Sequence, residues 1–277
     1  MIKIQRRGDL HIIKAGSEVS GRVIMWTNLY YYRGIVIDCG CINVADEIFK
    51  AIESIGEAKA VFITHHHEDH VGAAHLFNRK QVKIYASKET TKFLKDPPAI
   101  PEYRRIVWGQ PKPIEAEPVS NSITVDEVDI DVFKTPGHSP DHVIYKIGDM
   151  LFTGDLIGSL KPRIAYYDED YLEILNSVEN IVMKLNFTAV LGGHLIAAKE
   201  DIINFIRYLR TLKNRITELY NQGYTIDDIT NTLLSNVPKK VLMMEAVSRG
   251  EWKRRYLVKS LLGLKSDTKE SGNRGTQ

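Results

Sequence analysis

Residues 64–72 read Thr-His-His-His-Glu-Asp-His-Val-Gly and contain a His-x-His-x-Asp-His pattern. The members of this pattern are His65, His67, Asp69 and His70. The apolar run at 60–63 leads directly into the pattern and is typical of a buried strand, whereas the small apolar residues at 71–77 indicate the start of a helix. The pattern therefore lies on a strand-to-helix loop, where a rigid scaffold can present several ligands at one point.

The spacing within this loop favours a metal site. Side chains alternate along an extended chain, so His65 and His67 point to the same side. The Asp-His pair that follows then approaches a bound ion from the other side. No buried core needs four such groups in six residues, so metal ligation is the favoured interpretation. A second register, which begins at His66 and includes Glu68, lacks the terminal Asp-His pair, and we prefer the first.

Bulk composition sets further limits. The chain has 277 residues, is 43% hydrophobic and carries a net charge of +2, so it can bury a substantial core and its total charge points to no polyanionic partner. Cys39 and Cys41 are too close in sequence to form a disulfide easily, and free thiols are typical of a reducing cytosol. Residues 1–9 have no apolar signal-peptide core, and no apolar run approaches the ~20 residues of a membrane helix. We therefore expect a cytoplasmic protein without a membrane segment.

The periodicity of apolar residues predicts alternating strands and helices. Strands are predicted at 2–5, 10–14, 20–32, 34–38, 60–63, 82–86, 128–133, 142–147, 150–153 and 188–191. Helices are predicted at 44–55, 71–78, 87–95 and 168–185. Ser87 is a suitable N-cap for the third of these helices. The alternation indicates helices packed outside a pair of sheets.

The segment 97–118 carries six of the ten prolines and shows no clear periodicity. One interpretation is an irregular surface connection. The other is a loop over the active site, because long loops in compact domains are often binding elements. The residues alone leave both interpretations open.

From residue 199 onward the chain is predicted to be helical. The first helix ends at Gly223, and Thr225 forms a possible capping box with Asp228 at the start of a second. Pro238 suits the first turn of a third helix, and a fourth is predicted at 252–262. We expect three parts, whose ranges are 1–198 for a catalytic domain, 199–264 for a helical extension and 265–277 for a disordered tail.

Three later strand ends place a polar residue beside glycine. They are Pro136-Gly137-His138, Thr153-Gly154-Asp155 and Gly192-Gly193-His194. Small residues there allow the backbone to bend tightly and aim the polar side chain at a shared centre. One such residue alone would be a weak signal, but all three together with the first pattern strongly favour a metal site.

With these motifs in this order, the sequence resembles the metallo-β-lactamase-fold hydrolases over about residues 10–198. The resemblance implies an α+β fold, the four-layer αβ/βα sandwich, with the metals at one edge of the sheets. It implies that one metal is held by His65, His67 and His138, and that a second is held by Asp69, His70 and His194. Asp155 would bridge both metals, and Asp38 would lie near the metal ligands in a supporting role.

The chemistry follows from these ligand types. Imidazole and carboxylate suit two divalent ions, with zinc favoured and iron or manganese also compatible. Such a pair lowers the pKa of a bridging water towards ~7 and supplies a metal-bridging hydroxide at neutral pH. Asp69 can accept or relay a proton during the reaction. The sequence therefore predicts a metal-dependent hydrolase.

The sequence is similar to two branches of this superfamily. It shares the ligand set of glyoxalase II but lacks the Gly-Cys-Gly-Arg-like segment that follows the bridging aspartate there. The segment 136–142 resembles lactamase-β-like proteins, some of which cleave single-stranded RNA and which carry a small helical C-terminal domain. Lys161 and Arg163 are either anchors for a substrate carboxylate or phosphate or simply solvated loop charges. His142 either contacts substrate, supports a ligand or packs at its strand end.

The favoured substrate is a small molecule with an ester, thioester or lactone group. The alternative is a single-stranded RNA or DNA phosphodiesterase, because residues 239–265 hold eight basic and two acidic side chains, a net +6 that attracts phosphates. Apolar residues between these charges instead indicate helices that pack on the main domain, and no strand pair suggests a wing. A mononuclear iron dioxygenase is a third and weaker alternative, since seven ligands exceed what one iron needs. The residues do not predict the oligomeric state.

Overall fold

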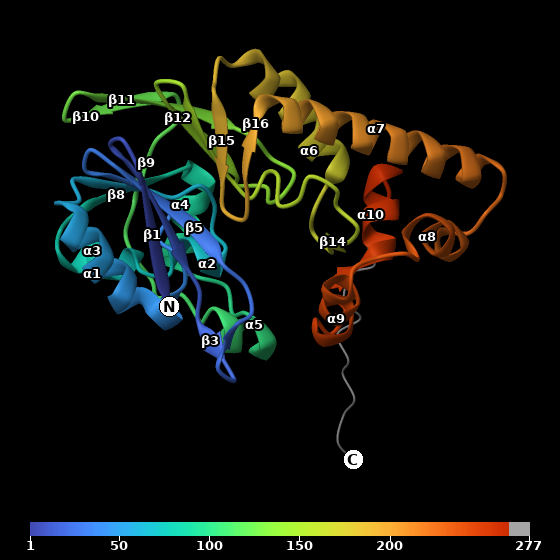
Figure 1. The fold of residues 1–277 in the computed structure, drawn as a ribbon, viewed down its shortest axis with the longest axis horizontal. Helices are drawn as coiled ribbons and strands as arrows, with labels where there is room; N and C mark the ends of the chain where they lie inside the picture. The colour runs from blue at the N-terminus through green and yellow to red at the C-terminus, as the bar shows by residue number, and fades with distance from the viewer. Residues whose placement is uncertain (266–277) are drawn as a thin grey trace.

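The computed structural model describes residues 1–265, which form two facing sheets with helices on both outer sides (Figure 1). The first sheet has the strand order β1-β2-β5-β6-β7-β8-β9. Its strands are β1 (Ile2–Arg7), β2 (Leu10–Ala15), β5 (Thr27–Tyr32), β6 (Ile35–Ile37), β7 (Ala60–Phe62), β8 (Lys83–Ala86) and β9 (Glu117–Pro118). The predicted α+β sandwich is confirmed.

The second sheet has the order β10-β11-β12-β13-β15-β16. Its strands are β10 (Ser122–Val125), β11 (Val128–Lys134), β12 (Val143–Ile147), β13 (Met150–Gly154), β15 (Ala189–Gly192) and β16 (Ile196–Ala198). Two small ribbons accompany the sheets, namely β3 (Glu18–Val19) with β4 (Arg22–Val23), and β14 (Ala165–Tyr166) with β17 (Trp252–Lys253).

The helices cover the outer faces of the two sheets. Those on the first sheet are α1 (Ala45–Ile55), α2 (Glu68–Val71), α3 (Ala74–Arg79), α4 (Lys88–Lys95) and α5 (Glu102–Val107), with a 3-10 turn at Ile42–Val44. The others are α6 (Tyr171–Asn180), α7 (Lys199–Asn221), α8 (Ile226–Leu234), α9 (Lys239–Val247) and α10 (Arg254–Leu261), with a 3-10 turn at Val182–Lys184. Figure 1 shows α7 extending away from the second sheet, and α8 to α10 follow below it, with α8 packed on α7 and α10 packed on α6, α7 and α8.

Three apolar clusters separate these layers. The cluster between the sheets joins alternate residues from both, such as Phe62 of β7 and Tyr145 of β12. A second cluster lies between the first sheet and α1 and α3. A third runs from the second sheet through α6 and α7 into α8 and α10, so it crosses the boundary predicted at residue 198. The helical extension thus packs on the sandwich with shared apolar contacts, which remove apolar surface from water.

Strand directions explain why distant polar residues meet. β6 and β7 are parallel, and so are β13 and β15. β11 pairs antiparallel with β12, which pairs antiparallel with β13, so β11 also runs in the direction of β13. The segments that follow these five strands therefore emerge at the same edge of their sheets. The five polar motifs predicted from the sequence are the segments that emerge there.

Local signals were good predictors of helix ends. The Ser87 side chain caps α4 by accepting a hydrogen bond from the Thr90 backbone N–H. Thr225 and Asp228 form the predicted capping box of α8. Each cap satisfies backbone donors that the first helical turn leaves unpaired.

Several secondary-structure predictions were wrong. The segment 97–118 contains the unpredicted α5 and β9, and its remaining residues form neither helix nor strand. The single strand predicted at 20–32 instead begins in the β3–β4 hairpin turn, where Ser20 and Gly21 have positive φ angles of 52° and 76°, and it is broken at 24–26 between β4 and β5. The strands β10, β14, β16 and β17 were not predicted, and β17 of the extension pairs with β14 of the sandwich. Apart from residue 265, the predicted tail lies outside the described residues.

Two predictions about the chain as a whole can also be compared with the structure. Cys39 and Cys41 are both free and buried. No helix within residues 1–265 combines the length and apolarity that a membrane crossing requires.

Candidate metal centre

Seven side chains gather in two groups at the shared edge of the sheets. The first group is His65, His67 and His138, and the second is Asp69, His70, Asp155 and His194. Within each group the potential ligand atoms all lie within 4.8 Å of one another, so either group could hold a metal ion. These groups are defined by geometry alone, and they coincide with the two ligand sets that the sequence resemblance implied.

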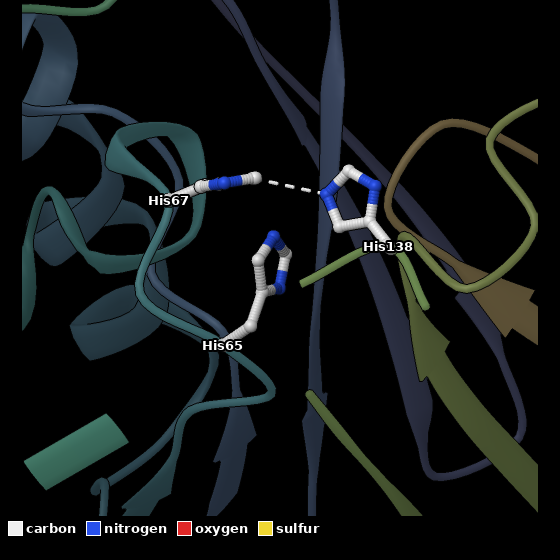
Figure 2. A group of neighbouring side chains, drawn as sticks. All are labelled: His65, His67 and His138. Atoms are coloured by element: carbon white, nitrogen blue, oxygen red, sulfur yellow. Dashed lines mark hydrogen bonds between the residues drawn. The ribbon is translucent and has the colours of Figure 1, made fainter. Parts of the chain in front are cut away.

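The first group is a triangle of imidazoles. The ring centroids of His65, His67 and His138 are separated by 4.6, 4.8 and 4.9 Å. Figure 2 shows the three rings converging from the loop after β7 and the segment after β11. The Nδ1 atom of His67 lies 2.9 Å from the Nε2 atom of His138. Three nitrogen donors thus face one point.

The second group interleaves carboxylates and imidazoles. Asp155 lies 3.3 Å from the Nε2 atom of His70 and 3.2 Å from the Nε2 atom of His194. An oxygen of Asp69 lies 3.4 Å from the same nitrogen of His194. Asp155 also approaches the first group, since its Oδ2 atom is 3.8 Å from the Nε2 atom of His138. Asp155 is therefore the residue that lies between the two groups.

Three of the imidazole rings form hydrogen bonds through the nitrogen that points away from the centre, and these bonds fix which nitrogen faces the centre. The Nδ1–H of His70 donates to Asp38 at 2.8 Å, and the Nδ1–H of His194 donates to the Trp26 carbonyl at 2.9 Å. Nδ1 of His138 contacts Glu169 at 2.9 Å. A ring that uses Nδ1–H in this way presents Nε2 to a metal, and such partners also make the ring a better donor.

Asp38 is held in a conformation suited to this role. It follows β6 directly and has a φ of 60°, which is uncommon for a residue with a side chain. Its carboxylate accepts hydrogen bonds from the backbone N–H and the hydroxyl of Thr64, at 2.8 and 2.9 Å. Asp38 thus links the start of the histidine loop to the imidazole of His70.

The electrostatics of the two groups differ. Burial, reinforced by the neighbouring His70, lowers the pKa of His65 well below its usual value. Burial acts in the same direction on His70, but the charges of Asp155 and Asp38 outweigh it and raise the pKa of His70 well above its usual value. The pKa of Asp155 is lowered well below its usual value although burial acts to raise it, because His194 and His70 lie beside it. The carboxylates of the second group therefore stay ionised and favour positive charge beside them.

The residues present fit a divalent metal. Within the described residues, His65 Nε2 is buried and has no hydrogen-bond partner, and buried His70 Nε2 and Asp155 Oδ1 have no hydrogen bond and lie 3.3 Å from each other. Buried polar atoms are almost always paired, so these atoms in one place call for a ligand. A Cβ atom added to Gly193 would lie 2.3 Å from Asp155 Oδ1 and 2.6 Å from His70 Cε1, so only glycine leaves both ligands in place.

Residues 28–194 match the model of the metallo-beta-lactamase superfamily. The chain belongs to this superfamily. It is 30% identical to "Probable metallo-hydrolase YybB" of Bacillus subtilis over 57% of this chain and 74% of that protein. It is 28% identical to "Hydroxyacylglutathione hydrolase GloC" of Haemophilus influenzae over 57% of this chain and 78% of that protein. The fold matches a metallo-beta-lactamase from Pontibacter korlensis with a TM-score of 0.60 and 15% identity, over 76% of this chain and 99% of that chain.

These similarities, together with the two groups, make the chain a hydrolase of the metallo-beta-lactamase superfamily with side chains positioned for metal binding. The other residues of the histidine loop point elsewhere. The backbone N–H and the Nδ1 atom of His66 contact Asp141 at 3.0 and 2.9 Å. Glu68 accepts two hydrogen bonds from Arg104, both at 2.6 Å.

The three predicted substrate contacts all have other contacts in the structure. His142 is 1% exposed, its Nδ1 atom lies 3.0 Å from the Thr135 hydroxyl, and burial followed by the charge of His138 lowers its pKa to about 3. Arg163 lies over the ring of Tyr208 in α7, and Lys161 lines a groove beside the same helix. The prediction that these residues contact substrate stays a prediction.

Sequence reasoning missed most of the supporting residues of this superfamily member. Glu169, Trp26 and Thr27 each contact a member of the two groups, Thr27 through a 3.0 Å hydrogen bond to Asp69. None of them belongs to a local motif, and each lies more than thirty residues from its partner. The acidic run before α6 was the only available hint of Glu169, and it reads equally well as a helix start.

Proposed function

We propose that the chain is a dinuclear-metal hydrolase that cleaves a small acyl substrate, namely an ester, thioester or lactone. Zinc is the favoured metal, because imidazole and carboxylate donors suit it, and iron or manganese fit the same donors. The observation that carries the proposal is the pair of ligand groups with Asp155 between them.

The ligand roles follow from this arrangement. His65, His67 and His138 would hold the first ion, and Asp69, His70 and His194 the second. Asp155 would bridge the two ions. When bound, two divalent ions lower the pKa of a water between them towards ~7 and supply hydroxide at neutral pH.

Asp69 is the proposed proton acceptor. Burial acts to raise its pKa, but His70 and His194 outweigh burial and lower it, so its carboxylate is available as a base near neutral pH. One of its oxygens accepts the hydrogen bond from Thr27, which fixes the orientation of the carboxylate. A base held in this way can take a proton from a nucleophile and later return it to a leaving group.

The surroundings of the first group suit an acyl substrate. The ring of Tyr166 lies 6.2 Å from that of His67, and the ring of Trp252 lies 5.4 Å from that of Tyr166. Aromatic surface beside a polar reacting centre is typical of small-molecule sites. The similarity to a protein named hydroxyacylglutathione hydrolase supports the same substrate class.

The nucleic-acid alternative has less support. The net charge of residues 239–265 suggested phosphate binding, but Arg249, Arg254 and Arg255 lie in ion pairs with Glu102, Glu245 and Asp227. These pairs reduce the charge that the extension offers to a polyanion. The mononuclear iron alternative uses one metal, whereas both ligand groups are complete here.

The deciding experiment combines metal analysis with a substrate panel. We expect two metal ions per chain and turnover of a thioester, ester or lactone. Cleavage of single-stranded RNA without acyl turnover would favour the phosphodiesterase, and one iron per chain with oxygen consumption would favour the dioxygenase. We also propose a cytoplasmic location, because both cysteines are free thiols.

A further inference from the structure

Three distant segments meet in a buried cluster of charged residues beside the metal loop. Both carboxylate oxygens of Glu68 in the loop accept a hydrogen bond from the guanidinium group of Arg104 in α5. Arg104 also lies 3.8 Å from Glu251, which immediately precedes β17 in the C-terminal extension (residues 199–264). Glu251 in turn accepts a 2.7 Å hydrogen bond from the Tyr103 hydroxyl. One arginine therefore joins a residue of the metal loop to a residue of the extension.

Because the cluster is buried, removal of one of its charged side chains should destabilise the protein. The side chains of Glu68, Arg104 and Glu251 are 3, 14 and 4% exposed. Buried ion pairs contribute little net stability compared with apolar packing, but removing one partner leaves an uncompensated buried charge. Such a cluster is therefore better explained by the position it imposes than by the stability it adds.

The position in question is that of the metal loop. Glu68 lies between His67 of the first ligand group and Asp69 of the second, so an anchored Glu68 fixes the spacing between the two groups. The extension also contacts the surroundings of the metal loop at a second place. β17 pairs with β14, and the Trp252 ring packs on Tyr166, whose hydroxyl accepts a 2.8 Å hydrogen bond from Arg104.

We propose that Arg104 and Glu251 are positioning residues for the metal loop, and that docking of the C-terminal extension thereby sets the metal affinity of the centre. This inference rests on the proposed function, because it assumes that the two groups bind metal. The effect of Arg104 and Glu251 passes through Glu68. In the sequence, Glu68 was a candidate ligand only in the second register of the histidine loop, the one that begins at His66 and that we did not prefer.

The same interface supplies a matched control. Arg249 and Glu102 form an ion pair between the extension and α5 at 3.6 Å, with side chains 74 and 63% exposed. An exposed pair of this kind contributes little. The variant Arg249→Ala therefore removes a charge contact between the same two segments without touching the buried cluster.

The test measures zinc affinity by chelator competition in the full-length chain, with the melting temperature of the metal-free protein measured in parallel. Variants are Glu251→Gln, which keeps the shape of the side chain, Arg104→Lys, which keeps the charge but loses the fork, and Arg249→Ala. Loss of a supporting partner typically costs roughly 10- to 100-fold in metal affinity, and we expect a loss of this size for Arg104→Lys and a smaller one for Glu251→Gln. Arg249→Ala should bind zinc like the wild type.

Each outcome decides the matter. If Glu251→Gln and Arg104→Lys lower only the melting temperature and bind zinc normally, the cluster is merely structural and the inference is wrong. If Glu251→Gln does not fold, Tyr103→Phe removes only the hydroxyl that orients Glu251 and should weaken zinc binding in the same direction. A wild type that binds no zinc would overturn the proposed function itself, whereas normal binding in the wild type and all variants would overturn this inference alone.

Discussion

The two ligand groups lie side by side but differ in their ligand types and in the pKa values of their side chains. The histidine triangle of His65, His67 and His138 contains no carboxylate, and burial lowers the pKa of His65 and His67. The other group contains Asp69 and Asp155, whose charges overcome burial and raise the pKa of His70 and His194. In the first group only His138 has a raised pKa, because its burial is outweighed by Glu169 and Asp155, so two of its three imidazoles are held neutral, whereas the second group contains two carboxylates. Asp155, which reaches both, is the residue on which the comparison depends most.

The largest effect is expected from Asp155→Ala. Because the carboxylate serves both groups, its loss should halve the metal content and lower the hydrolysis rate by about a thousandfold or more, equivalent to several kcal/mol of transition-state stabilisation. Metal analysis and steady-state kinetics on the purified variant provide the measurement. Unchanged stoichiometry together with an unchanged rate would contradict the dinuclear assignment.

The next largest effect is expected from the two carboxylates that contact the ligands from outside, because each of them acts on one group. Asp38→Asn should weaken the second group through His70, and Glu169→Gln should weaken the first group through His138, each by roughly 10- to 100-fold in metal affinity. Stepwise zinc titration distinguishes a loss of the tighter site from a loss of the weaker one. If both variants weakened the same step, the two groups would not be independent sites.

A smaller effect is expected from pH. His70 and His194 have raised pKa values in the metal-free chain, so a metal must displace their protons, and binding there weakens as pH falls through that raised range. In the first group His65 and His67 have lowered pKa values and stay neutral to lower pH, and only His138 has a raised pKa. Zinc should therefore leave the second group first on acidification, as followed by metal release against pH. Release in the opposite order would show that the charge difference does not control binding.

The smallest effect is expected away from both groups. Arg163 lies over the Tyr208 ring, a contact that contributes about 0.5–1 kcal/mol at an exposed position. Arg163→Ala should therefore lower the melting temperature slightly and leave the KM for acyl substrates nearly unchanged. A large rise in KM would instead assign Arg163 to substrate binding, as one interpretation of the sequence suggested.

Sequence reasoning succeeded where the information is local. The His-x-His-x-Asp-His pattern, the glycine beside each later ligand and the caps at Ser87 and Thr225 all depend on neighbouring residues. It failed for α5, because the prolines around that helix suggested irregular chain. Pro101 is in fact its N-cap, and the first turn of a helix tolerates proline. The strands β10 and β16 are short and pair in hairpins with the neighbouring strands β11 and β15, whereas β17 pairs with the distant β14.

The same distinction applies to the site. Glu169 lies 31 residues from His138, and Arg104 lies 36 residues from Glu68, so no spacing rule connects them. Arg104 also lies in the segment 97–118, for which the sequence left two interpretations open. The structure shows that this segment contacts the metal loop through Arg104 and the extension through Tyr103.

The most direct test of the central claim is anomalous X-ray scattering from crystals of the zinc-loaded protein. The account predicts two zinc peaks per chain, one within the triangle of His65, His67 and His138 and one beside Asp69, His70 and His194, with Asp155 contacting both. A single peak, or two peaks of which only one is contacted by Asp155, would contradict it.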